Sequence, residues 1–465
     1  MNFKDRQIDE FIKTDITDVK QGKKSILIKN GLLLTMDDNQ TVINDVYVFI
    51  ENGLIIEIGN IKDAPKADDV IDAENGFILP GFVNAHTHVP QTLFRGIGND
   101  KALYDWLSNH IWPMEGVMTP DDCLIGSLLT FVEMIKTGTT TFAEMYFHED
   151  KVIKATLKSG IRGVIGYGMV DFNDEKKRIK ELSLTRELLE TYYKIHDRIT
   201  FSVAPHAPTT CSSELLKEAS KIATNYDLLT HIHVAETENE INSIKKDYNK
   251  TPIEYLNDLG ILNPKTLAIH MVHLTKNDLE ISKKQDIKIV HCPQSNLKLA
   301  SGFMHLDKMF ARNLTVGLGT DSASSNNSLD MVREMKTMAI LHKALTKDAS
   351  FIPASKALNI ATKGGAKCLN LHDKIGSIEV GKRADIIIMD CNKSHVQPMH
   401  DPYTMIVYSM TGFDVKDTIV DGNILMKNRK LLTLNEEAII GKVKTSITNL
   451  KNKRIEKKRS LDSSE

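Results

Sequence analysis

The central part of the chain alternates between short apolar runs and longer segments with helical periodicity. Eight β-like apolar runs lie between Phe77 and Cys368, and helix-like segments lie between most of them. In order, the runs read FILPGFVNA, GTTTFAEM, IRGVIGYGMV, ITFSVAP, LLTHIHVA, TLAIHMV, IKIVHCP and TVGLGT. A strand–helix unit repeated about eight times is typical of a parallel (β/α)8 TIM barrel. We therefore predict an α/β fold with such a barrel at its centre.

Short β-rich runs also flank this central part on both sides. Upstream, ILIKNGLLLTM and VYVFIENGLIIEIG contain Asn30-Gly31 and Asn52-Gly53, which are pairs that favour tight hairpin turns. Downstream, GSIEVGKRADIIIMD and DTIVDGNILM have the same texture, with a third turn signal at Asp421-Gly422. We expect the two groups of strands to pair into one small β-domain built from both ends of the chain.

Two of the intervening helices have clear start signals. Thr119 is followed by Pro120 and two aspartates, which gives an N-cap, a first-turn proline and acidic groups at the positive end of the helix dipole. This helix is predicted to end at Gly138. Serines open another helix in CSSELLKEASKIATNY. The chain after residue 435 is predicted to form one amphipathic helix with a basic end.

These patterns divide the chain into five parts. We predict an N-terminal extension (1–23), the first part of the β-domain (24–79), the barrel (80–375), the second part of the β-domain (376–434), and a C-terminal helix with its tail (435–465). The N-terminus is polar with mixed charges, unlike a signal peptide. No stretch approaches the roughly 20 apolar residues that a membrane helix needs.

Composition excludes several classes of protein. The 465 residues carry a formal net charge of −2, which argues against a protein that coats nucleic acid or an anionic membrane. The five cysteines are scattered and form no CxxC pair, which is typical of a reducing compartment rather than of a disulfide framework. We therefore expect a soluble cytoplasmic protein with a small-molecule partner and no nucleic-acid or membrane partner. A homo-oligomer is compatible with these features.

Polar residues gather where strands of the predicted barrel end. His86 and His88 close the first run, and His233, His270 and Asp321 close the fifth, sixth and eighth. Residues i and i+2 of a strand point to one side, and active sites of TIM barrels lie at the C-terminal ends of the strands. Imidazole and carboxylate groups are suitable ligands for Zn²⁺ or a similar divalent ion. The sequence thus predicts a metal site at this rim.

Two other kinds of metal site fit the pattern less well. A structural zinc site is usually closed by four ligands and rich in cysteine, but no cysteine joins this group, and Glu236 and His270 lie at the same rim. Two-metal sites of related barrels usually bridge their ions with a modified lysine on the fourth strand, and ITFSVAPHAP contains no lysine. We expect one divalent ion, with Zn²⁺ favoured and Fe²⁺ as the alternative.

The motifs around these residues resemble those of the amidohydrolase superfamily over nearly the whole chain. They are PGFVNAHTH, HIHVAE, LAIHMVHL and GTDSASSNNSLDM. Within that superfamily, HTHVPQTLFRGIGNDKALYDWL, EMYFHED, VAPHAPTTCS and SNLKLASG are similar to segments of the 5-methylthioadenosine/S-adenosylhomocysteine deaminases. The resemblance implies a TIM barrel beside a composite β-sandwich. It also implies a zinc-dependent aminohydrolase that converts the adenine ring of a nucleoside to the inosine-type product and releases ammonia.

The resemblance assigns roles to individual residues. The metal ligands would be His86, His88, His233 and Asp321. Asp321 and His270 would hold and deprotonate a water molecule, and Glu236 would carry a proton to the adenine ring, so the catalytic residues would be Glu236, His270 and Asp321. The substrate-binding residues would be Trp106, Glu115, Arg178, His206, Glu236 and Ser325. Of these, Glu115 would accept hydrogen bonds from the ribose hydroxyl groups, and His206 would contact the ribose or the base. We interpret His231 and His273, by contrast, as structural residues.

One departure from the family pattern concerns the end of the third predicted strand. The family often has an arginine there, near the homocysteine carboxylate, whereas this sequence has Tyr167, and Arg178 farther along the loop is a loosely aligned second arginine. An arginine binds a carboxylate with two charged hydrogen bonds, and a tyrosine offers one neutral hydrogen bond. We therefore expect weaker use of S-adenosylhomocysteine than of methylthioadenosine or adenosine.

Other functions of the same fold are alternatives, because function lies in the loops grafted on the barrel. A guanine or cytosine deaminase and a triazine-type chlorohydrolase would use the same fold and metal site. By the resemblance, Trp106, Glu115 and the adjoining loop motifs favour an adenine nucleoside. A catalytically inactive binding protein is a third hypothesis, and the intact Glu236 and His270 argue against it.

Overall fold

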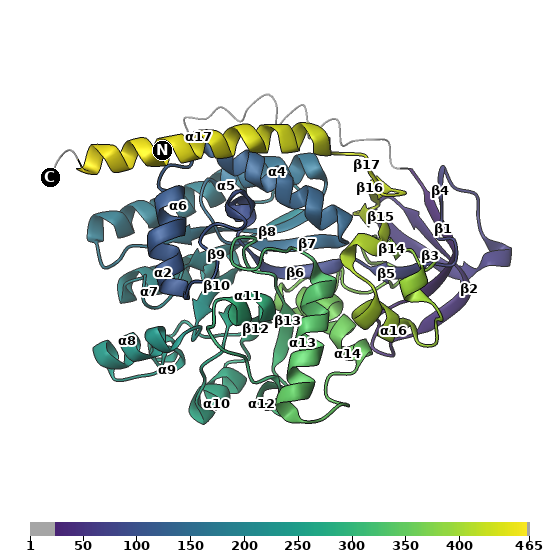
Figure 1. Cartoon of the computed structure of the whole chain (residues 1–465). Helices are drawn as coiled ribbons and strands as arrows, with labels where there is room; N and C mark the ends of the chain where they lie inside the picture. Colours follow the sequence, from purple (N-terminus) through teal and green to yellow (C-terminus); the bar gives the residue numbers. More distant parts are fainter. Residues whose placement is uncertain (1–23, 463–465) are drawn as a thin grey trace.

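The computed structural model describes residues 24–462, and the predicted N-terminal extension lies outside them. Within this range the chain forms two sheets, and most helices surround the larger body (Figure 1). An eight-stranded parallel sheet has the order β13-β12-β11-β10-β9-β8-β7-β6, so that consecutive strands are neighbours throughout. An isolated parallel bridge between Thr87 and Asp321 brings the first and last strands together. The predicted (β/α)8 barrel is confirmed.

The barrel strands coincide with the eight apolar runs of the sequence. They are β6 (Phe82–Thr87), β7 (Thr139–Glu144), β8 (Arg162–Met169), β9 (Ile199–Pro205), β10 (Leu229–Val234), β11 (Thr266–His270), β12 (Lys288–His291) and β13 (Thr315–Leu318). The first run differs from the prediction in one respect. It is split at Gly81, because Phe77–Pro80 form a strand of the second sheet and only β6 enters the barrel. A Cβ atom at Gly81 would lie 2.1 Å from the Thr140 side chain, so the switch between sheets requires glycine.

Helices follow most of these strands. They are α4 (Pro120–Lys136), α5 (Glu149–Ser159), α6 (Glu175–Tyr192), α7 (Ser213–Tyr226), α8 (Glu238–Tyr248), α9 (Pro252–Asp258), α10 (Lys276–Lys284), α11 (Pro293–Lys298), α12 (Leu306–Phe310), α13 (Met331–Thr346), α14 (Ala354–Asn359) and α15 (Gly365–Cys368). The two predicted start signals are confirmed. Thr119 and Asp122 form a reciprocal capping box at the start of α4, and Ser212 caps α7. Short helices α2 (Leu103–Trp106) and α3 (Trp112–Glu115) lie in the long segment between β6 and α4.

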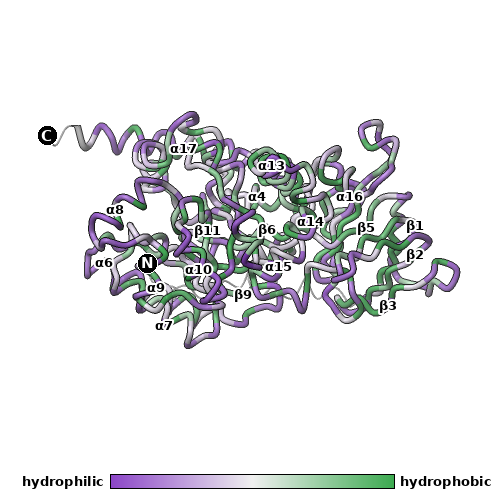
Figure 2. The backbone as a smooth tube through the Cα atoms, turned by 90° about the horizontal axis from the view of Figure 1, so that it is seen from below, coloured by the Kyte–Doolittle hydropathy of each residue, from purple (hydrophilic) through white to green (hydrophobic). Residues whose placement is uncertain are grey.

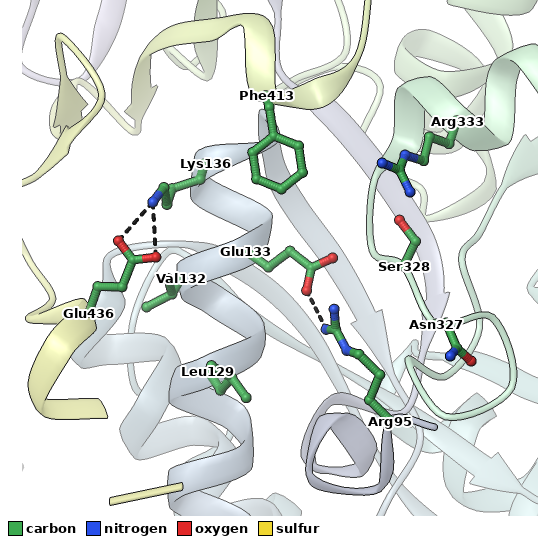
Figure 3. A pocket seen from close by; sticks show the side chains of 10 residues that line it. All are labelled: Arg95, Leu129, Val132, Glu133, Lys136, Asn327, Ser328, Arg333, Phe413 and Glu436. Atoms are coloured by element: carbon green, nitrogen blue, oxygen red, sulfur yellow. Dashed lines mark hydrogen bonds and ion pairs between the residues drawn. The ribbon is translucent and has the colours of Figure 1, made fainter. Parts of the chain in front are cut away.

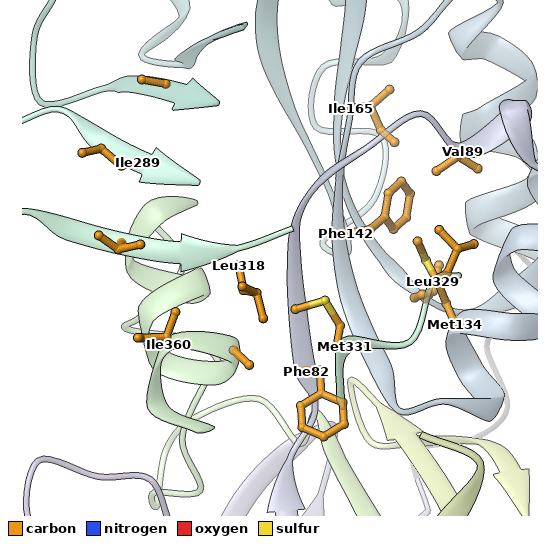
Figure 4. Packing of buried hydrophobic residues seen from close by; sticks show 14 of the residues in the cluster. Phe82, Val89, Met134, Phe142, Ile165, Ile289, Leu318, Leu329, Met331 and Ile360 are labelled. Atoms are coloured by element: carbon orange, nitrogen blue, oxygen red, sulfur yellow. The ribbon is translucent and has the colours of Figure 1, made fainter. Parts of the chain in front are cut away.

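Alternate residues of the barrel strands face two different cores. Val83, Ala143, Val164 and Val290 belong to the core inside the barrel. Their chain neighbours Phe82, Phe142, Ile165 and Ile289 pack outward against the helices (Figure 4). The hydropathy of the chain follows this arrangement, because hydrophobic segments follow the strands and hydrophilic segments follow outer helices such as α8 (Figure 2). This two-residue period fixes which side chains reach the inside of the barrel.

The second sheet joins the two ends of the chain. Its nine strands are β1 (Ile26–Leu34), β2 (Val42–Glu51), β3 (Leu54–Asn60), β4 (Asp69–Asp72), β5 (Phe77–Pro80), β14 (Ile386–Met389), β15 (Val415–Val420), β16 (Asn423–Lys427) and β17 (Lys430–Leu431). β5 from the N-terminal part pairs antiparallel with β14 from the C-terminal part. Buried residues of both parts, among them Ile28, Val48, Ile78 and Ile388, share one core. The β-domain built from both chain ends is confirmed.

Two of the three predicted hairpins form. Asn52-Gly53 connects β2 to β3, and Asp421-Gly422 connects β15 to β16, with positive φ at all four residues. The prediction of a hairpin at Asn30-Gly31 is wrong. The strand β1 continues through this pair with a β-bulge, because the residues on both sides stay paired with β2.

The C-terminal segment forms the long helix α17 (Glu436–Asp462), which confirms the predicted C-terminal helix. It lies along α4 on the outside of the barrel (Figure 1). Among residues 24–462, no helix is both long and apolar enough to cross a membrane.

Candidate active site

Four side chains from three barrel strand ends converge on one point. His86 Nε2 lies 3.1 Å from His233 Nε2 and 3.5 Å from Asp321 Oδ1, and His88 Nε2 lies 3.4 Å from the same carboxylate oxygen. Four ligands placed about 2.1 Å from a tetrahedral zinc ion lie roughly 3.4 Å from one another. The spacing of these donor atoms therefore fits a single divalent ion.

The tautomers of the histidines favour the same conclusion. His88 Nδ1 lies 2.6 Å from the carbonyl oxygen of Met145, and His233 Nδ1 lies 2.8 Å from that of His206. A carbonyl oxygen only accepts hydrogen bonds, so each Nδ1 carries the proton and each Nε2 presents a lone pair to the centre. Lone pairs that face one another at this distance repel unless a cation lies between them. The residues present thus fit a bound metal ion.

Burial keeps these imidazoles neutral. It lowers the pKa of His86 to about 3 and also lowers the pKa values of His88 and His233 below their usual range. Only a neutral imidazole can bind a metal ion. The three histidines are therefore ready to act as ligands at neutral pH.

The carboxylate of Asp321 is oriented by two serines. Ser295 Oγ donates a hydrogen bond to Asp321 Oδ2 at 2.5 Å, and Ser325 Oγ donates to the same oxygen at 3.0 Å. The other oxygen, Oδ1, faces His86 and His88. Burial raises the pKa of Asp321, but the hydrogen bond with His86 and the nearby histidines outweigh it, so the pKa lies well below the usual range. Asp321 is therefore a carboxylate with one oxygen reserved for the metal centre.

Glu236 and His270 form a pair beside the four donor side chains. His270 Nε2 lies 3.6 Å from Glu236 Oε2, and His270 Nδ1 lies 2.8 Å from Asn296 Oδ1. Ser301 Oγ donates to Glu236 Oε1 at 3.4 Å. Burial raises the pKa of Glu236, and the nearby His270 opposes part of this shift. A carboxyl group with a raised pKa next to a metal centre is suited to proton transfer.

The chain also matches a known family over most of its length. Residues 77–425 match the model of the amidohydrolase family. The chain belongs to the amidohydrolase family.

Several deaminases are among the known proteins similar to this amidohydrolase. It is 44% identical over 429 residues to a 5'-deoxyadenosine deaminase of Methanobrevibacter smithii, covering 92% of this chain and 98% of that protein. It is 42% identical over 427 residues to a 5-methylthioadenosine/S-adenosylhomocysteine deaminase of Caldanaerobacter subterraneus subsp. tengcongensis, covering 92% and 98%. The crystal structure of an adenosine deaminase from Xanthomonas campestris with bound zinc superimposes with a TM-score of 0.87 at 32% identity, covering 92% of this chain and 98% of that chain.

Two of the residues that we predict to bind substrate lie beside the predicted metal ligands of this amidohydrolase. Glu115 accepts hydrogen bonds from Gln91 Nε2 and Tyr146 Oη, each at 2.7 Å, and the Tyr146 ring centroid lies 6.4 Å from that of His88. The His206 ring centroid lies 4.8 Å from that of His233. Burial raises the pKa of Glu115 and lowers that of His206 to about 4. The roles of both residues toward substrate stay predictions.

The other predicted substrate contacts have different surroundings. Trp106 is buried, donates from Nε1 to the carbonyl oxygen of Ile97 at 3.1 Å, and packs in a separate apolar cluster. Arg178, in the first turn of α6, lies 4.0 Å from Asp171 Oδ2. Ser325 holds Asp321, which makes it a positioning residue for the metal site. Among these contacts, only that of Ser325 ties its side chain directly to the converging groups.

Tyr167 does not occupy the place that the sequence suggested. Its side chain forms a hydrogen bond with Glu181 of α6. Burial is the main cause that raises the pKa of Tyr167, and the nearby Glu181 raises it further. Tyr167 shares the outer core with Ile165, whereas Val164 faces the inside of the barrel. The side chain therefore points into the helix layer, and its identity carries no argument about the S-adenosylhomocysteine carboxylate.

Sequence reasoning missed the residues that orient the catalytic groups. Besides Ser295, Asn296 and Ser301, the carboxylate of Glu240 accepts hydrogen bonds from the backbone N–H groups of Ala235 and Glu236, at 2.8 and 2.9 Å. The two histidines interpreted as structural have supporting contacts of the same kind. His231 Nε2 lies 2.9 Å from His86 Nδ1, and His273 Nε2 lies 2.7 Å from the carbonyl oxygen of Ser301.

A separate surface pocket of about 420 Å³ lies between α4, the loop after Asp321 and the start of α17 (Figure 3). Its charged groups form ion pairs with one another, Arg95 with Glu133 and Lys136 with Glu436. It contains none of the predicted site residues. The chemistry of this amidohydrolase therefore belongs to the strand ends and not to this pocket.

Proposed function

We propose that this protein is a metal-dependent deaminase that hydrolyses the 6-amino group from the adenine ring of a nucleoside. The candidate substrates are 5'-deoxyadenosine, 5'-methylthioadenosine, S-adenosylhomocysteine and adenosine, and the products would be the inosine-type nucleoside and ammonia. The observation that carries the proposal is the position of Glu236 and His270 beside the converging metal donors. The 44% and 42% identity to deaminases of such nucleosides supports the choice of substrate class.

The side chains of His86, His88, His233 and Asp321 would hold the ion. Zinc is favoured because the similar adenosine deaminase structure contains it. When bound, such an ion lowers the pKa of a water molecule from about 15.7 toward about 7, which makes hydroxide accessible near neutral pH.

The residues of the chain would move the protons of the reaction. Burial raises the pKa of Glu236, which favours its protonated form. Glu236 would donate this proton to the ring nitrogen next to the amino-bearing carbon. This protonation makes the carbon electrophilic. Asp321, oriented by the hydrogen bonds from Ser295 and Ser325 to Oδ2, would accept the proton of the attacking water, while His270 holds that water. The proton taken up by Asp321 would then pass to the amino group, the carbon–nitrogen bond would break with release of ammonia, and the proton of the new hydroxyl group would return Glu236 to its protonated form as the carbonyl group of the product forms.

Substitution of Glu236 tests this assignment. Glu236→Gln keeps the shape of the side chain but removes its proton transfer, so we expect ammonia release to fall by roughly 100- to 10,000-fold while the metal content stays unchanged. Ammonia release and elemental analysis of the same sample measure the two quantities. The exposed Glu238, two residues farther on, supplies the matched control Glu238→Gln, which should behave like the wild type. Unchanged turnover in Glu236→Gln would remove the proton-shuttle assignment.

A substrate screen separates this proposal from the other deaminases of the fold. Ammonia release is compared over the four adenine nucleosides, guanine and cytosine with metal-loaded wild-type protein. Activity on guanine or cytosine alone would contradict the proposal. We also expect the protein in a reducing compartment such as the cytoplasm, because all five cysteines are free and buried.

A further inference from the structure

Three aromatic side chains form a cluster that the mechanism above does not use. Tyr104 lies in α2 and Trp112 in α3, both in the segment after β6, and Phe172 lies in the loop after β8. The Trp112 ring centroid is 6.4 Å from that of Tyr104 and 6.3 Å from that of Phe172, both in edge-to-face arrangements. Tyr104 and Phe172 remain 69% and 54% exposed. Grouped exposed aromatic rings mark a binding surface more often than isolated ones do.

One side of this cluster is tied to Glu115. Trp112 precedes Glu115 by three residues in α3, so that the two side chains lie on the same face of the helix. Glu115 accepts a hydrogen bond from Tyr146, whose ring lies next to the metal-binding His88. The Trp112 ring is therefore within one helical turn of a residue expected to contact the ribose.

The other side of the cluster is tied to His206. The backbone N–H of Phe172 donates to the carbonyl oxygen of Thr210 at 3.1 Å, and Thr210 Oγ1 lies 2.9 Å from His206 Nδ1. The His206 ring in turn lies beside the metal-binding His233. The contact between Trp112 and Phe172 thus links α3, which carries Glu115, to the loop after β8, which is hydrogen-bonded to the loop that carries His206.

We propose that Tyr104, Trp112 and Phe172 bind the 5'-substituent of the nucleoside and favour an apolar group such as a 5'-methyl or 5'-alkylthio group. This inference rests on the proposed function. With the amino-bearing carbon at the predicted metal ligands and the ribose at Glu115, the 5'-carbon, at the far end of the nucleoside, would point to the aromatic cluster next to Glu115. Aromatic rings stabilise methyl groups by burial and thioether sulfur by direct contact, whereas a hydroxyl group there loses hydrogen bonds to water.

A positive charge lies next to the cluster. Lys177 Nζ lies 4.7 Å from the centroid of the Phe172 ring. A second cation, such as a sulfonium, would be repelled by this ammonium group, and the Phe172 ring already forms a cation–π contact with Lys177. The ammonium group of Lys177 therefore disfavours a cationic substituent, and the aromatic rings favour an apolar one.

The ratio of kcat/KM for 5'-methylthioadenosine to that for adenosine tests the proposal, because the two substrates differ only at the 5'-position. We expect Phe172→Ala and Trp112→Leu to lower this ratio roughly three- to tenfold, mainly through KM for 5'-methylthioadenosine. Phe172 has a φ of +49°, so Phe172→Leu, which keeps apolar bulk at the same backbone position, serves as a second variant. It should retain more of the ratio than Phe172→Ala.

Tyr193→Ala is the matched control. Its ring packs edge-to-face on Tyr226 and has Lys194 Nζ 5.2 Å from its centroid, but it lies at the C-terminal end of α6, away from the strand ends of the site. The ratio should stay at the wild-type value in this variant. Equal losses for both substrates in Phe172→Ala and Trp112→Leu, or an unchanged ratio, would overturn the inference and leave the deaminase function intact. A wild-type protein that releases ammonia from no nucleoside would overturn both.

Discussion

Glu334 is a buried carboxyl group behind the loop that carries Asp321. Its carboxylate accepts hydrogen bonds from Asn326 Nδ2 and from the backbone N–H of Gln294, so it joins the loop after β13 to the start of α11. Burial raises the pKa of Glu334 to about 8, although these hydrogen bonds oppose the shift. The group that holds together two parts of the metal site is thus itself expected to titrate near neutral pH.

This titration predicts a pH dependence of stability. The folded carboxyl group releases its proton at about 8, and the unfolded group does so near 4.5, so the native state binds the extra proton between these values. The free energy of unfolding should therefore fall as the pH rises from about 4.5 to about 8, by up to about 5 kcal/mol from this residue.

Glu334→Gln isolates this contribution. Denaturant unfolding of the wild type and the variant is measured across this pH range, and the stability of the variant relative to the wild type should rise with pH. Glu437→Gln, at an exposed position of α17, should follow the wild-type curve. Parallel curves for the wild type and Glu334→Gln would show that Glu334 does not titrate in this range.

Individual residues of the site show what the sequence could predict and what it could not. His86, His233 and Asp321 are visible because each lies at the end of an apolar run, and barrel topology alone brings those ends together. Ser295 and Glu240 carry no such signal. They reach the site from α11 and from α8, and only the packing of those helices against the strand ends decides what their side chains contact.

At the scale of elements, α17 supports the segment that carries Glu115. Leu450 of α17 is fully buried in a cluster with Trp106, Ile111 and Met114. Arg454 of the same helix donates to the backbone carbonyl of Asn109 at 3.0 Å. The C-terminal helix is therefore packed against the short helices α2 and α3, which also carry Tyr104 and Trp112.

Truncation of Leu450 should disturb this support. Leu450→Ala is expected to reduce the free energy of unfolding by about 2–5 kcal/mol, because it leaves a cavity next to Trp106 and Met114. We also expect a higher KM for the nucleoside with unchanged metal content, since the cluster contacts the segment of Glu115 and none of the metal ligands. Ile455→Ala, at a half-exposed position of the same helix, is the control and should stay within about 0.5 kcal/mol of the wild type. An unchanged KM in Leu450→Ala would show that α17 does not position the substrate-binding segment.

Local signals predicted elements well where no distant strand competed with them. The Asn52-Gly53 hairpin forms because β2 and β3 are joined only by that turn. Asn30-Gly31 has the same local preference, but β1 also pairs with β2, β4 and β5, and continuous pairing on both sides outweighs the turn. The predicted place of the Tyr167 side chain was wrong for a related reason. The face of a sheet to which a side chain points depends on the register of its strand, and a shift of one residue moves it to the other face.

At the scale of the whole molecule, a buried ion-pair network joins the barrel to the second sheet. Arg162, the first residue of β8, binds Asp385 through Nε at 2.8 Å and through a terminal nitrogen at 2.9 Å, and it also contacts Asp421. Arg162 is 3% exposed. This contact lies at the N-terminal end of the barrel strands, the end that supports stability rather than chemistry in TIM barrels.

Removal of one partner should therefore weaken the whole fold while sparing the site. Arg162→Ala leaves Asp385 buried without its partner, so we expect a loss of about 3–5 kcal/mol in the free energy of unfolding. Arg186→Ala is the matched control, because its ion pair with Glu218 is 3.7 Å long and exposed, and such pairs contribute about 0–1 kcal/mol. Both variants should keep the metal content and the KM of the wild type at temperatures below their unfolding transitions. If Arg162→Ala unfolded like Arg186→Ala, the two sheets would depend on their apolar contacts alone, and the turn at Asp421 would have no part in joining the ends of the chain to the barrel.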